Sequence, residues 1–108
     1  MNKISVKYLK KTKNSNTKWF EYYFGTEEYT IEELLSYIKG NQSLFGPSEI
    51  TFLLANFKFT QTQQMIDYYI SLNPSYRDLS LLLFNCEYAK NNEKLLKYIE
   101  KLLERKKL

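Results

Sequence analysis

Two stretches of the chain carry the same arrangement of apolar and polar residues, displaced by 29 positions. Residues 48–72 align with residues 77–101 without a gap. The aligned identities are Leu53 with Leu82, Leu54 with Leu83, Asn56 with Asn85, Tyr69 with Tyr98, and Ile70 with Ile99. A fixed period of about 20–50 residues is typical of helical hairpins that stack and bury one face against a neighbour. The pattern therefore predicts two αα-hairpins, over residues 47–74 and 75–107.

The first segment of each repeat has apolar residues at helical spacing. The matching positions are Ile50, Leu53, Leu54 and Phe57 in one repeat and Leu79, Leu82, Leu83 and Cys86 in the other. Residues 50–60 are also rich in β-branched and aromatic residues, so periodicity alone leaves a buried strand open. The match between the two repeats favours a helix for this segment. Thr60 and Gln63 have the spacing of a capping box, which predicts that the next helix begins at Thr60.

A separate helix is predicted upstream of the repeats. Thr30 followed three residues later by Glu33 has the spacing of a capping box. Ile31, Leu34 and Ile38 then follow a helical stripe that ends at Gly40. These signals predict a helix over residues 30–40.

The amino-terminal part shows a period of two instead. In residues 3–11 the apolar residues alternate with lysines, and in residues 18–24 Phe20, Tyr22 and Phe24 alternate with Trp19, Glu21 and Tyr23. A polar cluster of turn-forming residues separates the two segments. This alternation predicts a β-hairpin over residues 1–26.

The predicted fold is therefore α+β and mostly α, in a single domain over residues 1–108. A β-hairpin precedes about five helices, and the last four form the two hairpin repeats. Their stack resembles the packing of tetratricopeptide repeats, but the period of 29 is shorter than the roughly 34 of that family. Either Leu54 and Leu83 or Ala55 and Phe84 stand where that family has a glycine, so the sequence identifies no family.

The composition of the chain limits its disulfide chemistry and its expected location in the cell. The lone cysteine, Cys86, cannot form an internal disulfide, and it is predicted to be a buried core thiol rather than a reactive one. No secretory leader and no apolar run of membrane-spanning length is recognisable, so a cytoplasmic protein without a membrane partner is expected.

The absence of histidine removes the commonest general base and the commonest metal ligand. With one cysteine and three glycines, the chain also lacks the usual parts of a zinc site and of a phosphate-binding loop. We therefore expect no cofactor, no metal and no enzymatic activity. A small enzyme that uses tyrosine, lysine and carboxylates is the third hypothesis, after a protein-binding module and a nucleic-acid-binding protein.

The net charge of +4 comes largely from the two ends of the chain. Candidate contacts to nucleic-acid phosphates are Lys3, Lys7, Lys11 and Lys18 in the hairpin, and Lys101 and Arg105 near the carboxyl end. Lysines interleaved with exposed aromatic rings are typical of surfaces that bind single strands. The competing interpretation is a solvated face on which lysine stems cover the rings.

Tyrosine and tryptophan give the candidate protein-binding residues, which are Tyr68, Tyr76, Trp19 and Tyr23. The leading functional hypothesis is a non-enzymatic intracellular module that binds another protein. It would act as an adaptor, an inhibitor or an immunity-type antagonist that occludes its partner, and it would originate from a bacteriophage or another mobile element. A nucleic-acid-binding protein is the alternative, and the exposed ends of a two-unit stack also permit a homodimer.

Overall fold

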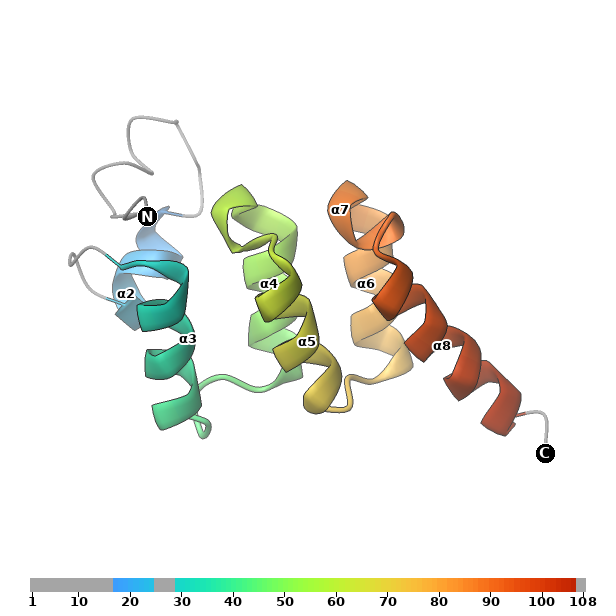
Figure 1. Cartoon of the computed structure of the whole chain (residues 1–108). Coiled ribbons are helices and arrows are strands. Elements are labelled where there is room, and N and C mark those ends of the chain that lie inside the picture. The colour runs from blue at the N-terminus through green and yellow to red at the C-terminus, as the bar shows by residue number, and fades with distance from the viewer. Residues whose placement is uncertain (1–16, 25–28, 107–108) are drawn as a thin grey trace. The chain divides into compact units, whose positions relative to one another are not determined.

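A computed structural model describes residues 17–24 and 29–106 of the chain. In this part the secondary structure consists of seven α-helices and one short 3₁₀-helix, with no strand (Figure 1). The chain divides into two compact units, Met1–Gln42 and Ser43–Leu108. The mostly helical character agrees with the prediction, whereas the β-hairpin is wrong. Single-domain organisation remains a prediction.

The first unit contains α2 (Thr17–Phe24) and α3 (Ile31–Gly40). Helix α2 occupies the segment predicted as the second hairpin strand, while the first strand, residues 3–11, lies outside the described residues. On a strand, Phe20, Tyr22 and Phe24 would share one face. In α2 Phe20 and Phe24 are buried, whereas the side chain of Tyr22 is 83% exposed.

Pairs of aromatic residues four positions apart account for the helix. The rings of Trp19 and Tyr23 lie 4.8 Å apart, and those of Phe20 and Phe24 lie 4.6 Å apart. Residues i and i+4 are neighbours on a helix surface, so this segment satisfies a helical period as well as a period of two. The aromatic residues that favoured a strand in the sequence therefore stabilise a helix.

Helix α3 begins with the predicted capping box. The backbone N–H of Glu33 donates to Oγ1 of Thr30 at 3.1 Å, and the N–H of Thr30 donates to Oε1 of Glu33 at 3.1 Å. Tyrosine hydroxyls donate to the last carbonyls of α2: Tyr29 to Phe24 at 2.8 Å and Tyr37 to Tyr23 at 3.1 Å. These bonds satisfy acceptors that a helix end leaves without an intrahelical donor.

The second unit contains the two repeats. The first comprises α4 (Pro47–Asn56), the 3₁₀-helix η1 (Lys58–Thr60) and α5 (Gln63–Ser71). The second comprises α6 (Tyr76–Asn85), α7 (Glu87–Lys90) and α8 (Glu93–Lys106). Helix α4 packs against α5 and against α6, and α5 packs against α8, so the hairpins stack side by side (Figure 1).

The displacement of 29 residues holds for the first helix of each repeat. Helices α4 and α6 each have ten residues, and their bounds differ by the predicted 29 positions. Phe57 follows α4 with φ −130° and ψ 102°, and Cys86 follows α6 with φ −135° and ψ 102°. The interpretation of residues 50–59 as helix rather than strand is therefore confirmed for residues 50–56, after which Phe57 is extended and Lys58–Thr60 forms η1.

The second helices are displaced by one further residue. Oγ1 of Thr62 accepts from the N–H of Met65 at 3.2 Å, so α5 begins after Thr62 rather than at the predicted Thr60. In the second repeat Oδ1 of Asn92 accepts from the N–H of Leu95 at 3.1 Å. The extra residue fits the connecting helices, since η1 has three residues and α7 has four. A gapless alignment hides this insertion.

Buried hydrogen bonds fix the end of α4. The hydroxyl of Thr60 lies 2.9 Å from the carbonyl oxygen of Leu53, and Nε2 of Gln61 donates to the carbonyl of Leu54 at 2.9 Å. The same Leu54 carbonyl accepts from the thiol of Cys86 at 3.4 Å, which joins the two repeats. Cys86 is 1% exposed, so its prediction as a core residue is confirmed.

A polar network on the surface connects α5 with α8. Nζ of Lys94 lies 2.8 Å from Oδ1 of Asp67, and Nε2 of Gln63 donates to the same oxygen at 2.9 Å. Nδ2 of Asn92 donates to Oε1 of Gln63 at 3.0 Å. The hydrogen bonds from Lys94 and Gln63 lower the pKa of Asp67, against a smaller opposing effect of desolvation.

Candidate functional site

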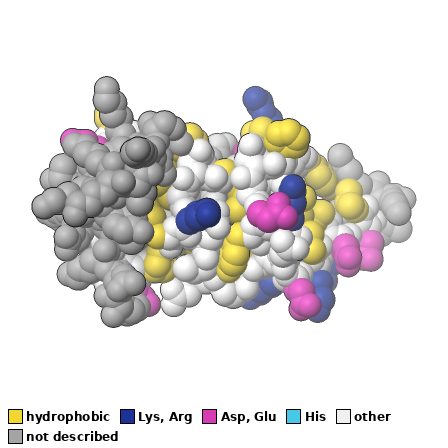
Figure 2. Space-filling model, turned by 90° about the horizontal axis from the view of Figure 1, so that it is seen from above, with side chains coloured by type: hydrophobic (Ala, Val, Ile, Leu, Met, Phe, Trp, Pro, Cys, Tyr) yellow, Lys and Arg dark blue, Asp and Glu magenta, His cyan; other side chains and the backbone are white. Residues whose placement is uncertain are grey.

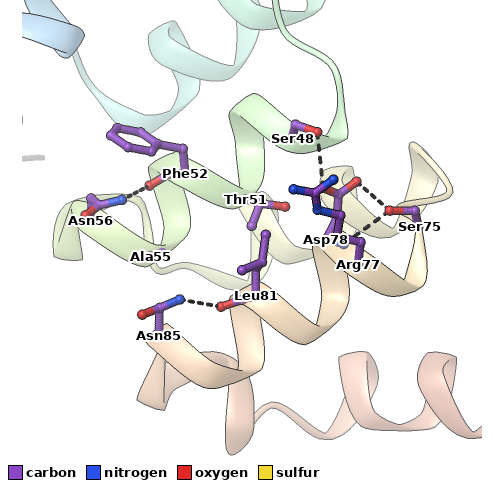
Figure 3. A pocket seen from close by; sticks show the side chains of 10 residues that line it. All are labelled: Ser48, Thr51, Phe52, Ala55, Asn56, Ser75, Arg77, Asp78, Leu81 and Asn85. Atoms are coloured by element: carbon purple, nitrogen blue, oxygen red, sulfur yellow. Dashed lines mark hydrogen bonds between the residues drawn. The ribbon is translucent and has the colours of Figure 1, made fainter.

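A groove of about 720 Å³ runs between α4 and α6 in the second unit (Figure 3). Its lining comes entirely from these two helices and the residue before α6. The lining residues are Ser48, Thr51, Phe52, Ala55, Asn56, Ser75, Arg77, Asp78, Leu81 and Asn85. Sites for small molecules and peptide side chains commonly have volumes of about 300–1,000 Å³. The groove is therefore large enough to hold part of a ligand or of a partner protein.

Three pairs of equivalent positions of the two repeats contribute to the lining of this groove. They are Ser48 with Arg77, Phe52 with Leu81, and Asn56 with Asn85, each pair 29 residues apart. On each helix these positions are four residues apart and therefore share one face. The stacking of α4 against α6 thus brings these three positions of both repeats into one groove, together with Thr51, Ala55, Ser75 and Asp78.

Hydroxyl and charged groups occupy the end of the groove at the helix amino termini. Ser48 donates to Oδ1 of Asp78 at 3.1 Å, and Ser75 donates to Oδ2 at 3.0 Å. The N–H of Asp78 donates back to Ser75, so this carboxylate takes part in the cap of α6. Arg77 is exposed, and neither ion pair found among the described residues includes it.

Apolar groups occupy the middle of the groove. The side chain of Leu81 is 47% exposed and extends into the space between the two helices (Figure 3). Phe84, three residues further along α6, is 83% exposed. Exposed large apolar residues that adjoin a groove are a feature of protein-binding surfaces.

Asparagines occupy the other end. Nδ2 of Asn56 donates to the carbonyl of Phe52 at 2.9 Å, and Nδ2 of Asn85 donates to the carbonyl of Leu81 at 2.8 Å. Each amide therefore directs its nitrogen back to its own helix (Figure 3). The side-chain oxygen of Asn85, an exposed residue, remains as an acceptor toward solvent.

None of the predicted site residues lines the groove. Tyr68 is half-buried with its hydroxyl oxygen buried, and burial raises its pKa. It is therefore less exposed than the sequence suggested. Tyr76 is 37% exposed and donates to the carbonyl of Leu102 at 3.0 Å, so it connects α6 with α8. Trp19 and Tyr23 are half-buried in α2 and pack against each other with their ring planes tilted by 46°.

The predicted nucleic-acid contacts are only partly described. Lys3, Lys7 and Lys11, and the side chain of Lys18, lie outside the described residues. Lys101 and Arg105 are exposed on α8. Glu100 and Glu104 precede them and are also exposed. Figure 2 likewise shows basic and acidic side chains scattered among one another on the described part of the face it presents, so no basic patch forms there.

The described residues include no group of three histidine, cysteine or acidic side chains placed to hold a metal ion. No helix in the described part of the chain is long and apolar enough to cross a membrane.

The groove was not predicted from the sequence, because the helical pattern identifies the residues of the core and not those that line a surface groove. Leu79, Leu82 and Cys86 are buried, whereas Leu81 and Phe84 lie off that stripe and are exposed. Apolar residues between the core positions of an amphipathic helix were the available signal.

Comparisons with known proteins yield no relative: no protein-family model, no curated protein and no solved structure matches this chain.

Proposed function

We propose that this chain is a non-enzymatic module that binds a segment of another protein in the groove between α4 and α6. It would act inside the cell as an adaptor or as an inhibitor that occludes the segment it holds. The observation that carries the proposal is the exposure of Leu81 within a groove that is lined by residues of both repeats.

The apolar centre supports this assignment. Burying a leucine side chain contributes about 1.5–3 kcal/mol, so a leucine left 47% exposed retains part of that free energy for binding. Phe84, three residues after Leu81 on the same helix, is a second exposed apolar side chain, although it does not line the groove. Interfaces derive most of their binding energy from a few such apolar anchors.

The polar groups at both ends of the groove favour a protein segment over a purely apolar ligand. Hydroxyls and charges at one end and amides at the other provide donors and acceptors on both sides of Leu81. A peptide carries apolar side chains and main-chain polar groups at short spacing, so it can satisfy both kinds of surface at once.

A display experiment tests the proposal. The full chain is immobilised and challenged with a library of random heptapeptides displayed on phage. Enriched peptides are then measured with purified chain by fluorescence anisotropy, using the wild type and Leu81→Asp. We expect Leu81→Asp to weaken binding by roughly tenfold or more, because it places a charge in the apolar centre.

Leu103→Asp is the matched control. Leu103 lies on α8 and is 48% exposed, against 47% for Leu81, but it does not line the groove. Circular dichroism of both variants verifies that the helices are retained. Peptides that lose affinity equally with both variants, or with neither, would contradict the proposal.

A further inference from the structure

The groove also restricts the kind of segment that it can hold, and this inference rests on the proposed function. Arg77, Leu81 and Asn85 form one wall, four residues apart along α6. A helix rises 1.5 Å per residue, so these positions are spaced by about 6 Å along its axis. Alternate side chains of an extended segment are spaced by about 6.6 Å. Three alternate side chains can therefore follow the three wall positions almost in register.

The asparagine end favours an extended segment over a helical one. Nδ2 of Asn85 is engaged with the carbonyl of Leu81, so its side chain offers an acceptor to the partner. The interior N–H groups of a helix are already bonded within the helix. An extended segment, by contrast, has main-chain N–H groups available to donate to Asn85.

The end of the groove at Arg77 favours a negatively charged group of the partner. Arg77 and Asp78 are the charged residues of the lining. One carboxylate oxygen of Asp78 accepts a hydrogen bond from Ser48 and the other accepts one from Ser75, so both oxygens already have donors within the chain. Arg77 is exposed and has five donors in a planar fork that matches a carboxylate. The amino termini of α4 and α6 lie at the same end, and their dipoles also favour an anion there.

We infer that the groove holds an extended acidic segment, in which a carboxylate on Arg77 and an apolar side chain on Leu81 are two residues apart. A main-chain N–H near the far end of the segment donates to Oδ1 of Asn85. The order of the contacts is fixed along the groove: anion, apolar side chain, then N–H donor.

The test uses peptides enriched by display and resynthesised with a fluorescent label. In each peptide the acidic residue two positions from the apolar one is changed to the uncharged amide and to lysine. Dissociation constants are measured by anisotropy at two salt concentrations, with wild type, Arg77→Glu and Arg105→Glu. Arg105 is the matched control, because it is an exposed arginine on α8 outside the groove.

We expect the amide peptide to bind the wild type roughly tenfold more weakly, as for a lost charge-assisted hydrogen bond. Arg77→Glu should reduce binding of the acidic peptide and restore binding of the lysine peptide, whereas Arg105→Glu should do neither. Affinity of the acidic peptide should also fall with salt.

Two negative results are distinguishable. Peptides that require Leu81 but bind equally well as acid, amide and lysine forms would overturn this inference and leave the proposed function standing. Enriched peptides whose affinity is unaffected by Leu81→Asp would overturn the proposed function and this inference together.

Discussion

The hydroxyl pair between Thr51 and Tyr69 provides the sharpest test of the second unit. Their oxygens lie 2.8 Å apart in the core, and Thr51 also lies 2.8 Å from the carbonyl of Pro47. A threonine hydroxyl has one proton. If Thr51 donates it to Pro47, Tyr69 must be the donor to Thr51. The two substitutions that remove this bond should therefore have unequal costs.

The magnitudes follow from what each substitution leaves behind. Tyr69→Phe removes the donor and leaves Thr51 bonded to Pro47, so it should cost about 1 kcal/mol of unfolding free energy. Thr51→Val leaves the hydroxyl of a fully buried Tyr69 without its acceptor, which should cost about 2 kcal/mol. The double variant should be about as stable as Tyr69→Phe alone, because no orphaned donor remains.

The same tyrosine makes stability depend on alkaline pH. Burial raises the pKa of Tyr69 to about 12, above the ordinary value of 10.0. Because the folded pKa is the higher one, the stabilising contribution is fully present below pH 10 and is lost as the pH rises toward 12. The loss amounts to about 1.4 kcal/mol at pH 11. Tyr69→Phe has no hydroxyl to ionise and does not show this loss. Its unfolding free energy, which is about 1 kcal/mol lower than that of the wild type at neutral pH, should therefore equal the wild-type value near pH 11.

Urea unfolding followed by far-ultraviolet circular dichroism measures this between pH 7 and pH 11.5. Tyr22→Phe is the control, since Tyr22 is 83% exposed and its variant should follow the wild-type curve at every pH. A difference between wild type and Tyr69→Phe that stays constant over this range would refute the buried hydroxyl pair.

Three further outcomes are expected in the second unit. Thr60→Val should lower the unfolding free energy by about 1 kcal/mol in urea titrations, because it removes the buried hydroxyl that lies 2.6 Å from the carbonyl oxygen of Phe57 and 2.9 Å from that of Leu53; an unchanged midpoint would contradict this. The thiol of Cys86, 1% exposed, should react with Ellman's reagent only as fast as the protein opens, and immediate reaction in native buffer would refute its burial. The lowered pKa of Asp67 means that its contribution is present above the ordinary value of 3.8 and is lost as the pH falls through the lower folded pKa, so the difference in stability between wild type and Asp67→Asn should shrink as the pH falls below 3.8. At pH 7 they should differ by less than about 1 kcal/mol, since both partners of the ion pair are exposed.

The helices of the repeats were predictable because several independent signals coincide there. The spacing of Ile50, Leu53 and Leu54 gives the core face, and all three are fully buried. The displacement of 29 residues predicts the equal bounds of α4 and α6. The one-residue insertion before α8 was not predictable from identities, since Tyr69 and Tyr98 match in the gapless alignment. It became visible only through the caps at Thr62 and Asn92.

The β-hairpin failed for a reason that lies in residues 18–24. A short run in which nearly every residue is aromatic satisfies a period of two and a helical period equally well. The distinguishing residue is Tyr22, which shares a strand face with Phe20 and Phe24 but lies on the opposite side of a helix. Its exposure depends on tertiary packing, which local sequence does not specify.

The repeat specifies the groove as well as the core, although by a different set of positions. Core positions such as Leu53 and Leu82 are chosen by packing inside the unit, and they supply aligned identities. Groove positions differ between the repeats, as Ser48 and Arg77 do: Ser48 donates to Asp78 of the other repeat, whereas Arg77 is exposed. Asn56 and Asn85 are the exception: both line the groove and both return a hydrogen bond to their own helix. Asn41 and Asn91, which do not line the groove, donate in the same way to the carbonyls of Tyr37 and Glu87 four residues earlier, so the identity of Asn56 and Asn85 follows from how these helices end.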